Sequence, residues 1–248
     1  MKNTSIVTLL VLLISFSVYG QQKETQPSVI SLPLIGDTAP AFRAQSTMGT
    51  INFPSDYFGK WKILFSHPAD FTAVCSSEII GLATMQEDFK KLNTQIVVLS
   101  TDGINSHISW VKALESINAD NIPNFKINFP LISDQGLEIS KKYGMIRPNS
   151  TDTKDIRAVF IIDTEDKIRA IFYYPANVGR NLQEIQRTLV ALQTSEKHHV
   201  LIPVNWNPGD KVMIQSPKDV QEADKLAASK NRFLSSPIWF MWYKDLGI

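Results

Sequence analysis

The stretch from residue 63 to residue 92 constrains the fold most, because it joins a buried strand to an amphipathic helix through a short loop. The apolar run Ile63-Leu64-Phe65 is typical of a strand. After the loop, apolar residues recur at spacings of three and four, the pattern of one buried helix face: Cys75, Ile79, Leu82, Met85, Phe89 and Leu92. This pattern places Cys75 in the first turn of the helix.

Cys75 is the only cysteine among the 248 residues. A cysteine in a first helical turn lies near free N–H groups and the positive end of the helix dipole, which stabilise the reactive thiolate. A lone cysteine is also compatible with a small buried apolar residue that does no chemistry. Because one cysteine cannot form an internal disulfide, a conventional apolar core must hold the chain together.

Strand and helix patterns alternate beyond this stretch. We expect strands at 62–66, 96–100 and 129–132, helices at 75–92, 106–117, 137–143 and 181–193, and a hairpin of 157–163 with 168–173. Parallel crossovers followed by an antiparallel pair predict an α/β fold, a mixed β-sheet flanked by helices on both faces. With a first-turn cysteine after an early strand and a terminal hairpin and helix, this is the plan of the thioredoxin-like fold.

Three smaller features are expected to dock on this core. A hairpin around Met48-Gly49-Thr50 should turn Ile51 and Phe53 inward. The segment before it should pack through Leu34 and Phe42. The helix at 106–117 should bury Ile108, Val111 and Leu114 on one face.

The N-terminus has the composition of a secretory signal. A lysine at position 2 precedes a mostly apolar run from Ile6 to Val18, and small residues lead to Gly20. The run is shorter than the roughly 20 apolar residues that span a bilayer, although an uncleaved anchor remains the alternative. We expect residues 1–20 to be a signal peptide, residues 21–31 a flexible leader, and the mature protein to be exported to the periplasm or the extracellular medium without a stable membrane anchor.

The charge balance argues against nucleic acid or an anionic membrane as partner. The chain has 25 basic and 24 acidic residues, and one of the basic residues, Lys2, lies in the expected signal. Both of those partners require a basic excess. The adjacent His198 and His199 would point to opposite faces of an extended chain, so neither a metal nor another cofactor is expected.

The character of the chain changes after Gln193. Residues 32–195 are long enough for the α/β domain, and prolines break 196–248 into short pieces that we expect to form a small extension domain, with a helix beginning at Pro217. The tail contains an apolar, aromatic run from Ile238 to Tyr243. Such residues need to be covered, so we expect a homodimer, or a higher oligomer built from it, with the extension at the interface.

The loop before the helix resembles the active-site motif P-x-x-x-T-x-x-C of the peroxiredoxin family, with Pro68, Thr72 and Cys75 at the matching positions. The resemblance is to the one-cysteine branch, which joins a domain like alkyl hydroperoxide reductase and thiol-specific antioxidant to a C-terminal one-cysteine peroxiredoxin domain. It extends from about Leu34 to Gln221. Further matching pieces are Leu64 to Pro68, Tyr174-Pro175-Ala176, Gly179-Arg180-Asn181, Pro203 to Trp206 and Gly209 to Met213.

The resemblance implies a set of site residues. Cys75 would attack the peroxide, Thr72 would offer a hydroxyl, and Pro68 would shape the loop and shield the sulfur. Arg157 matches the family's active-site arginine and Arg180 its second, although either residue type is also common as a solvated charge at a strand or helix start. Glu78 would hold an arginine in place, with dipole complementarity at the helix start as the alternative. His67 would either take part in proton transfer or pack at the rim of the pocket.

The sequence departs from the family pattern at several positions, which limits the activities that the resemblance implies. Ala73 stands where a proline is common, and Ser76-Ser77 where two threonines are common. Mammalian-type members carry a serine linked to phospholipase activity in the segment that corresponds to Phe58–Lys62. This chain has none there, so that activity is not implied.

The implied function is that of a thiol-dependent peroxidase. Cys75 would reduce hydrogen peroxide or an organic hydroperoxide and become a sulfenic acid. Because no second cysteine is present, an external thiol or redox protein would have to regenerate it. The alternative is an exported, non-enzymatic binding or chaperone-like protein on the same scaffold. Thiol–disulfide exchange is disfavoured because the chain lacks a C-x-x-C pair.

The signal-peptide interpretation predicts that the exported protein begins at Gln21. N-terminal sequencing of the protein recovered from the cell envelope or the medium checks this expectation. An N-terminus at Met1 or at Pro27 would contradict it.

Overall fold

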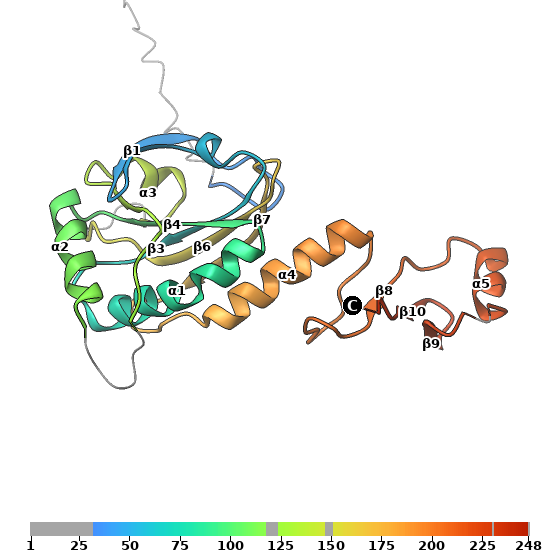
Figure 1. Ribbon diagram of the computed structural model, residues 1–248. Coiled ribbons are helices and arrows are strands. Elements are labelled where there is room, and N and C mark those ends of the chain that lie inside the picture. The colour runs from blue at the N-terminus through green and yellow to red at the C-terminus, as the bar shows by residue number, and fades with distance from the viewer. Residues whose placement is uncertain (1–31, 118–123, 147–150, 230, 248) are drawn as a thin grey trace, which may run out of the picture. The chain divides into compact units, whose positions relative to one another are not determined.

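The computed structural model describes residues 32–117, 124–146, 151–229 and 231–247 (Figure 1). The predicted signal peptide and leader lie outside the described residues. The elements are β1 (Phe42–Ser46), β2 (Gly49–Phe53), η1 (Ser55–Tyr57), β3 (Trp61–Ser66), α1 (Ala73–Lys91), β4 (Thr94–Ser100), α2 (Ile104–Glu115), β5 (Leu131–Ser133), α3 (Glu138–Lys142), β6 (Arg157–Ile162), β7 (Ile168–Tyr174), α4 (Leu182–His198), β8 (Val212–Met213), α5 (Val220–Ala227), β9 (Leu234–Ile238) and β10 (Met241–Lys244).

A seven-stranded mixed sheet forms the centre of the fold, in the order β2-β1-β5-β4-β3-β6-β7. The strands β3, β4 and β5 are parallel, whereas β6 runs antiparallel to β3 and β7 antiparallel to β6. The predicted crossovers, the terminal hairpin and the mixed character of the sheet are therefore confirmed. The hairpin of β1 and β2 is confirmed as well, and it buries Ile51 and Phe53 as expected.

Apolar side chains alternate between the two faces of the sheet, and each face has its own core. On one face, Ile63 and Phe65 of β3 pack with buried residues of α1, α2 and α4. On the other, Leu64 packs with the β1–β2 hairpin and with Tyr143, which follows α3. Figure 1 shows α1 and α4 together below the sheet and α3 above it. Burial of both faces explains why β3, β4 and β6 read as continuous apolar runs.

Three local expectations were wrong in part. Leu34 is 64% exposed, and backbone hydrogen bonds such as Gly36 N–H to the Ile168 carbonyl dock its segment, whereas Phe42 packs on the Phe53 ring as expected. Helix α2 packs Leu114 and Val111 against the core as expected, but Ile108 faces outward. The last helix begins at Val220 rather than at Pro217, since the Asp219 side chain caps it by accepting from the Glu222 N–H.

Helix α4 runs through position 195, where we placed the domain boundary. Its buried Ala191 shares a small apolar cluster with three residues of the C-terminal segment, Val200, Trp206 and Val212. The strands β8, β10 and β9 form a separate three-stranded sheet in that segment. Among the residues that the structure describes, none of the helices combines the length and apolarity needed to cross a bilayer.

Candidate active site

The end of β3 delivers the chain into the loop that precedes Cys75. Strand β3 is fully buried, and the His67 N–H continues its pairing by donating to the Leu99 carbonyl of β4. The loop then turns, and α1 begins at Ala73 with Thr72 in extended conformation at its N-cap. Cys75 is consequently the third residue of α1, as predicted, and its side chain is completely buried.

Arg157 reaches the sulfur from the first position of β6. Because β6 is antiparallel to β3, with Val159 opposite Phe65, the start of β6 lies beside the end of β3 and the loop that follows. Nη1 of Arg157 donates to Sγ of Cys75 at 3.3 Å and to Oε2 of Glu78 at 2.7 Å, and the opposite edge of the guanidinium donates to the Ala176 carbonyl. Arg157 is buried, so it is not a solvated strand-start charge.

Glu78 holds both arginines. Besides Arg157, its carboxylate accepts Nε, Nη2 and the backbone N–H of Arg180 at 2.9, 2.7 and 2.8 Å. Arg180 is buried as well, and its Nη1 donates to the carbonyls of Ser66 and Ala158. Burial lowers the pKa of Arg180, and the Glu78 carboxylate opposes that shift. Arg180 therefore orients Glu78 and stabilises the sheet beside the site, through hydrogen bonds to Glu78 and to backbone carbonyls rather than to the sulfur.

The charges in this cluster balance only when the sulfur is ionised. Two guanidinium groups face one carboxylate, and all three side chains are almost fully buried. A buried excess charge is unfavourable because no solvent screens it. A thiolate at Cys75 would supply the missing negative charge, and Arg157 would then give it a charged hydrogen bond. The arrangement thus suits a group that must be a nucleophilic anion.

Thr72 and Pro68 flank the approach to Cys75 along the chain. The Thr72 hydroxyl donates its hydrogen to the Ala69 carbonyl at 2.9 Å, so what it offers to another molecule is its oxygen as an acceptor. Pro68 is buried and lines a depression of about 620 Å³, together with Ile156, Tyr174 and Pro175.

Asp155 lines the same depression but lies almost entirely below the surface. Only about 2% of the residue is exposed. Burial raises the pKa of Asp155 well above the usual range, the Ser140 hydroxyl opposes that shift, and the Asp134 and Asp102 carboxylates raise the pKa further. The Asp155 side chain is therefore expected to be a neutral carboxylic acid.

His67 is fully buried against the Trp110 ring, with ring centroids 5.1 Å apart. Burial lowers its pKa well below the usual range, and the nearby His107, Arg180 and Arg157 lower it further, against an opposing effect of the Ala69 backbone. Nε2 lies 3.7 Å from Oδ1 of Asp70. His67 is accordingly a neutral imidazole beside the site, and whether it transfers a proton stays a prediction.

Sequence reasoning missed Asp70, Asp102 and His107. The available signal was the spacing of His107, Trp110 and Leu114 on one face of α2. His67, Asp70 and His107 bring potential metal ligands within 4.8 Å of one another. Both ring nitrogens of His107 already face oxygen acceptors, and the positive charges of two arginines act on His67. The cluster is therefore better suited to hydrogen bonding than to holding a cation.

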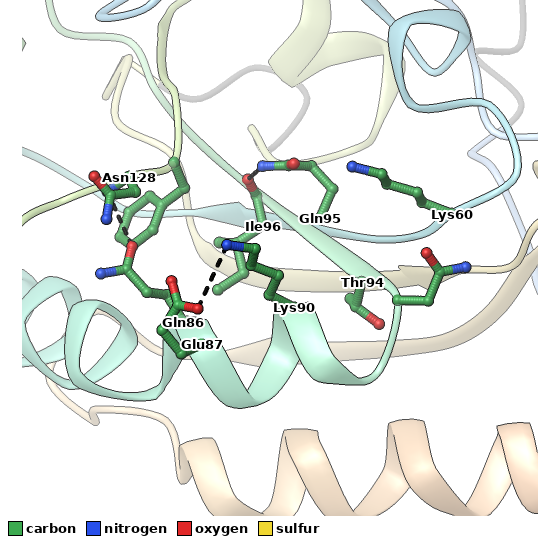
Figure 2. A pocket seen from close by; sticks show the side chains of 10 residues that line it. Lys60, Gln86, Glu87, Lys90, Thr94, Gln95, Ile96 and Asn128 are labelled. Atoms are coloured by element: carbon green, nitrogen blue, oxygen red, sulfur yellow. Dashed lines mark hydrogen bonds and ion pairs between the residues drawn. The ribbon is translucent and has the colours of Figure 1, made fainter.

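The pocket drawn in Figure 2 lies away from Cys75. It is lined by Lys60, Gln86, Glu87, Lys90, Asn93, Thr94, Gln95, Ile96, Asn128 and Phe129. Lys90 belongs to the last turn of α1, about 22 Å along the helix axis from Cys75 at the usual rise per residue. The residues that line this pocket include neither a cysteine nor an arginine, so the pocket has no part in the chemistry of the sulfur.

The arrangement of loop, cysteine and arginines can be compared with known proteins. Residues 35–171, more than half of the chain, match the model of the AhpC/TSA family, and residues 191–230 match the C-terminal domain of 1-Cys peroxiredoxin. A peroxiredoxin of Methanosarcina mazei is 47% identical over 86% of this chain and 98% of its own. One of Aquifex aeolicus is 42% identical over 79% and 91%, respectively. The chain belongs to the peroxiredoxin family.

Solved structures agree with this peroxiredoxin in fold. A yeast mitochondrial 1-Cys peroxiredoxin, studied for its thiol resolving mechanism, superposes with a TM-score of 0.74 at 34% identity, covering 86% of this chain and all of that one. Peroxiredoxin 6 of Arenicola marina gives 0.73 at 31% identity, covering 86% and 97%. The thioredoxin-like fold is thereby confirmed. With one cysteine and a one-cysteine C-terminal domain, this peroxiredoxin is a thiol peroxidase, an oxidoreductase that acts on peroxides.

The neutral state of His67 has a consequence for stability. In the unfolded chain a histidine takes up a proton near pH 6.5, whereas His67 in the folded protein does not. The unfolded state therefore gains protons as the pH falls. The contribution of His67 to the free energy of unfolding should fall by about 1.4 kcal/mol per pH unit below pH 6. Urea denaturation of the wild type and of His67→Gln between pH 5 and 7.5 measures this difference in slope. Parallel pH profiles for the two proteins would contradict it.

Proposed function

We propose that this chain is an exported one-cysteine peroxidase in which Cys75 reduces hydrogen peroxide and organic hydroperoxides and an external thiol completes the cycle. The observation that carries the proposal is the contact of Nη1 of Arg157 with Sγ of Cys75, inside a buried cluster that is one negative charge short without the thiolate.

In the first step, the Cys75 thiolate attacks one oxygen of the peroxide. The sulfur–oxygen bond forms as the O–O bond breaks, so the sulfur is oxidised by two electrons and the peroxide is reduced. The leaving alkoxide or hydroxide takes up a proton and departs as an alcohol or water, and Cys75 is left as a sulfenic acid.

The surrounding residues suit the movement of charge in this step. The Arg157 guanidinium retains its charge and can donate to the sulfur and to the developing oxyanion at once. The Thr72 oxygen can accept the hydrogen of the peroxide, since its own hydrogen is donated to Ala69. Pro68, which has no N–H, covers part of the site without competing for the oxyanion.

Regeneration requires a thiol from outside the chain. A first thiol condenses with the sulfenic acid, releasing water and forming a mixed disulfide, and a second thiol releases Cys75 and leaves as a disulfide. For the yeast mitochondrial 1-Cys peroxiredoxin, thiol resolution proceeds via glutathione and thioredoxin systems. We extend the same class of reductant, a small thiol or a redox protein, to this chain. The non-enzymatic alternative finds no support in the comparisons.

Replacing Cys75 with serine should reduce peroxide consumption in the presence of dithiothreitol to that of buffer, because the nucleophile is lost. Ser77→Ala, on the exposed side of the same helical turn, is the matched control and should retain the wild-type rate. Mass spectrometry of the wild type after stoichiometric peroxide should show one added oxygen atom on Cys75. Substantial turnover by Cys75→Ser would refute the mechanism.

Export is proposed from the N-terminal signal alone, and the destination is the periplasm or the extracellular medium.

The oligomeric state, a homodimer, is likewise proposed, from the aromatic C-terminal surface. The tip of the β9–β10 hairpin exposes Ile238, Trp239 and Phe240, with Trp239 61% exposed. Trp239 also lines a depression of about 400 Å³ with Pro217, Val220 and Ala223. An apolar surface of this kind is stabilised when a second copy covers it.

The dimer proposal predicts a dimeric mass in light scattering across the micromolar range. Replacing Trp239 with serine should weaken the association, because it removes the largest exposed ring of the surface. Phe58→Ser, which removes a more exposed ring elsewhere, is the matched control and should leave the mass unchanged. A monomeric wild type at micromolar concentration would overturn the proposal.

A further inference from the structure

The peptide unit between Ala69 and Asp70 is held from both of its polar sides. The Asp70 N–H donates to Oδ2 of Asp102 at 2.8 Å, and the Ala69 carbonyl accepts the Thr72 hydroxyl at 2.9 Å. The N–H and C=O of one peptide lie in a single plane and point in opposite directions. The carboxylate that fixes the N–H therefore also fixes the direction of the carbonyl that orients the Thr72 hydroxyl.

The side chain of Asp70 fixes the same unit from a third direction. Both of its carboxylate oxygens lie 2.9 to 3.0 Å from Nδ1 of His107, and Nε2 of His107 lies 3.0 Å from the Ile132 carbonyl. Both ring nitrogens of His107 are thus engaged by oxygen atoms of its neighbours. Asp70 and His107 are buried, so this contact ties the loop to α2 and β5 away from solvent.

The next residue shows why such support is needed. Phe71 has a φ of 55°, a left-handed conformation that is uncommon for a residue with a large side chain. Phe71 is 60% exposed, and the packing given for its ring is a tilted contact with the Trp110 ring at 6.4 Å between centroids, so packing alone is a weak support for this conformation. A strained residue persists where its surroundings over-determine it. Here the contacts on Asp70 do so, and the left-handed turn brings Thr72 back to the Ala69 carbonyl.

Asp102 is itself anchored to the sheet. Its Oδ2 accepts the Ser100 hydroxyl at 3.1 Å, its N–H donates to the Ser100 oxygen at 3.0 Å, and its carbonyl accepts the Ser133 hydroxyl at 2.8 Å. Ser100 and Ser133 are direct partners at the ends of β4 and β5. A chain of hydrogen bonds thus runs from the central sheet through Asp102 and the Ala69–Asp70 peptide to the Thr72 hydroxyl.

We propose that Asp102 is a positioning residue for the peroxidase reaction, acting on Thr72 through the Ala69–Asp70 peptide, with His107 as a second support. The proposal rests on the proposed function, in which the Thr72 oxygen contacts the peroxide. Asp102 acts without contact to the peroxide, since its carboxylate is engaged by the loop backbone and by Ser100. Its removal lets the peptide plane rotate and frees the Thr72 hydroxyl from its acceptor.

A double-mutant cycle separates this role from general stabilisation. The four proteins are the wild type, Asp102→Ala, Thr72→Val and the double variant. The measurement is the second-order rate constant of Cys75 oxidation in a single turnover, by quenched flow and mass spectrometry. Each single variant should be slower by about tenfold, the rate equivalent of one lost hydrogen bond. The double variant should be no slower than the slower single variant, because both changes disable the same contact.

Two further proteins sharpen the comparison. Asp102→Asn keeps an oxygen that can accept the Asp70 N–H and should lose less of the rate than Asp102→Ala. Asp134→Ala is the matched control, because Asp134 is also a buried aspartate at the end of a central strand that accepts backbone N–H groups, in this case at α3. It should lower stability and leave the rate constant of the folded protein unchanged. A crystal structure of Asp102→Ala should show Thr72 Oγ1 no longer bonded to the Ala69 carbonyl.

The proposal is overturned if Asp102→Ala is folded and reacts at the wild-type rate, or if its effect multiplies with that of Thr72→Val. If Asp102→Ala loses its native circular-dichroism spectrum, the double-mutant cycle is measured with Asp102→Asn in its place. Its neutral acceptor makes a weaker hydrogen bond, so a loss of about threefold, absent in the Thr72→Val background, is then expected. Failure of the proposed function itself would be visible separately, as a wild type whose Cys75 is not oxidised by peroxide.

Discussion

The buried carboxylate of Glu78 is the interaction on which the site depends. It binds two guanidinium groups that arrive from different parts of the chain, at the start of β6 and just before α4. Arg180 also donates to the carbonyls of Ser66 and Ala158 and lies over the Phe65 ring. One acidic side chain in the second turn of α1 thereby fixes the helix that carries Cys75 to the strands that carry the cationic partner.

This interaction is tolerable in the core only because nearly every donor has an acceptor. Leaving a buried charge unpaired would cost several kcal/mol, so the hydrogen bonds of the arginines to backbone carbonyls are as necessary as their bonds to Glu78. The one charge that remains uncompensated is where the thiolate forms. Reactivity and stability are consequently coupled, since the group that reacts is also the group that completes the charge balance of the core.

The loop from His67 to Thr72 adds a second layer of control. Asp102, in the turn after β4, holds its backbone at Asp70, and His107 of α2 holds the Asp70 side chain. His67 stays neutral beside this loop, because burial disfavours its charged form and the nearby arginines disfavour it further. The loop therefore depends for its conformation on residues that lie outside its own sequence.

The sequence by itself determined the order of elements in the α/β domain, the place of Cys75 in the first turn of α1, and the motif that relates Pro68 and Thr72 to it, because these depend on local periodicity and on spacing along the chain. Only the tertiary structure decided that Arg157 contacts the sulfur, that Glu78 holds both arginines, and that Asp102 and His107 support the loop. Those contacts join residues 32 to 102 positions apart, and the register of β6 against β3 and the packing of α2 on the sheet create them. A pattern within one segment cannot predict a contact between residues so far apart in the chain. Asp102 looks like any turn residue in sequence, and its role follows from which peptide the fold brings to it.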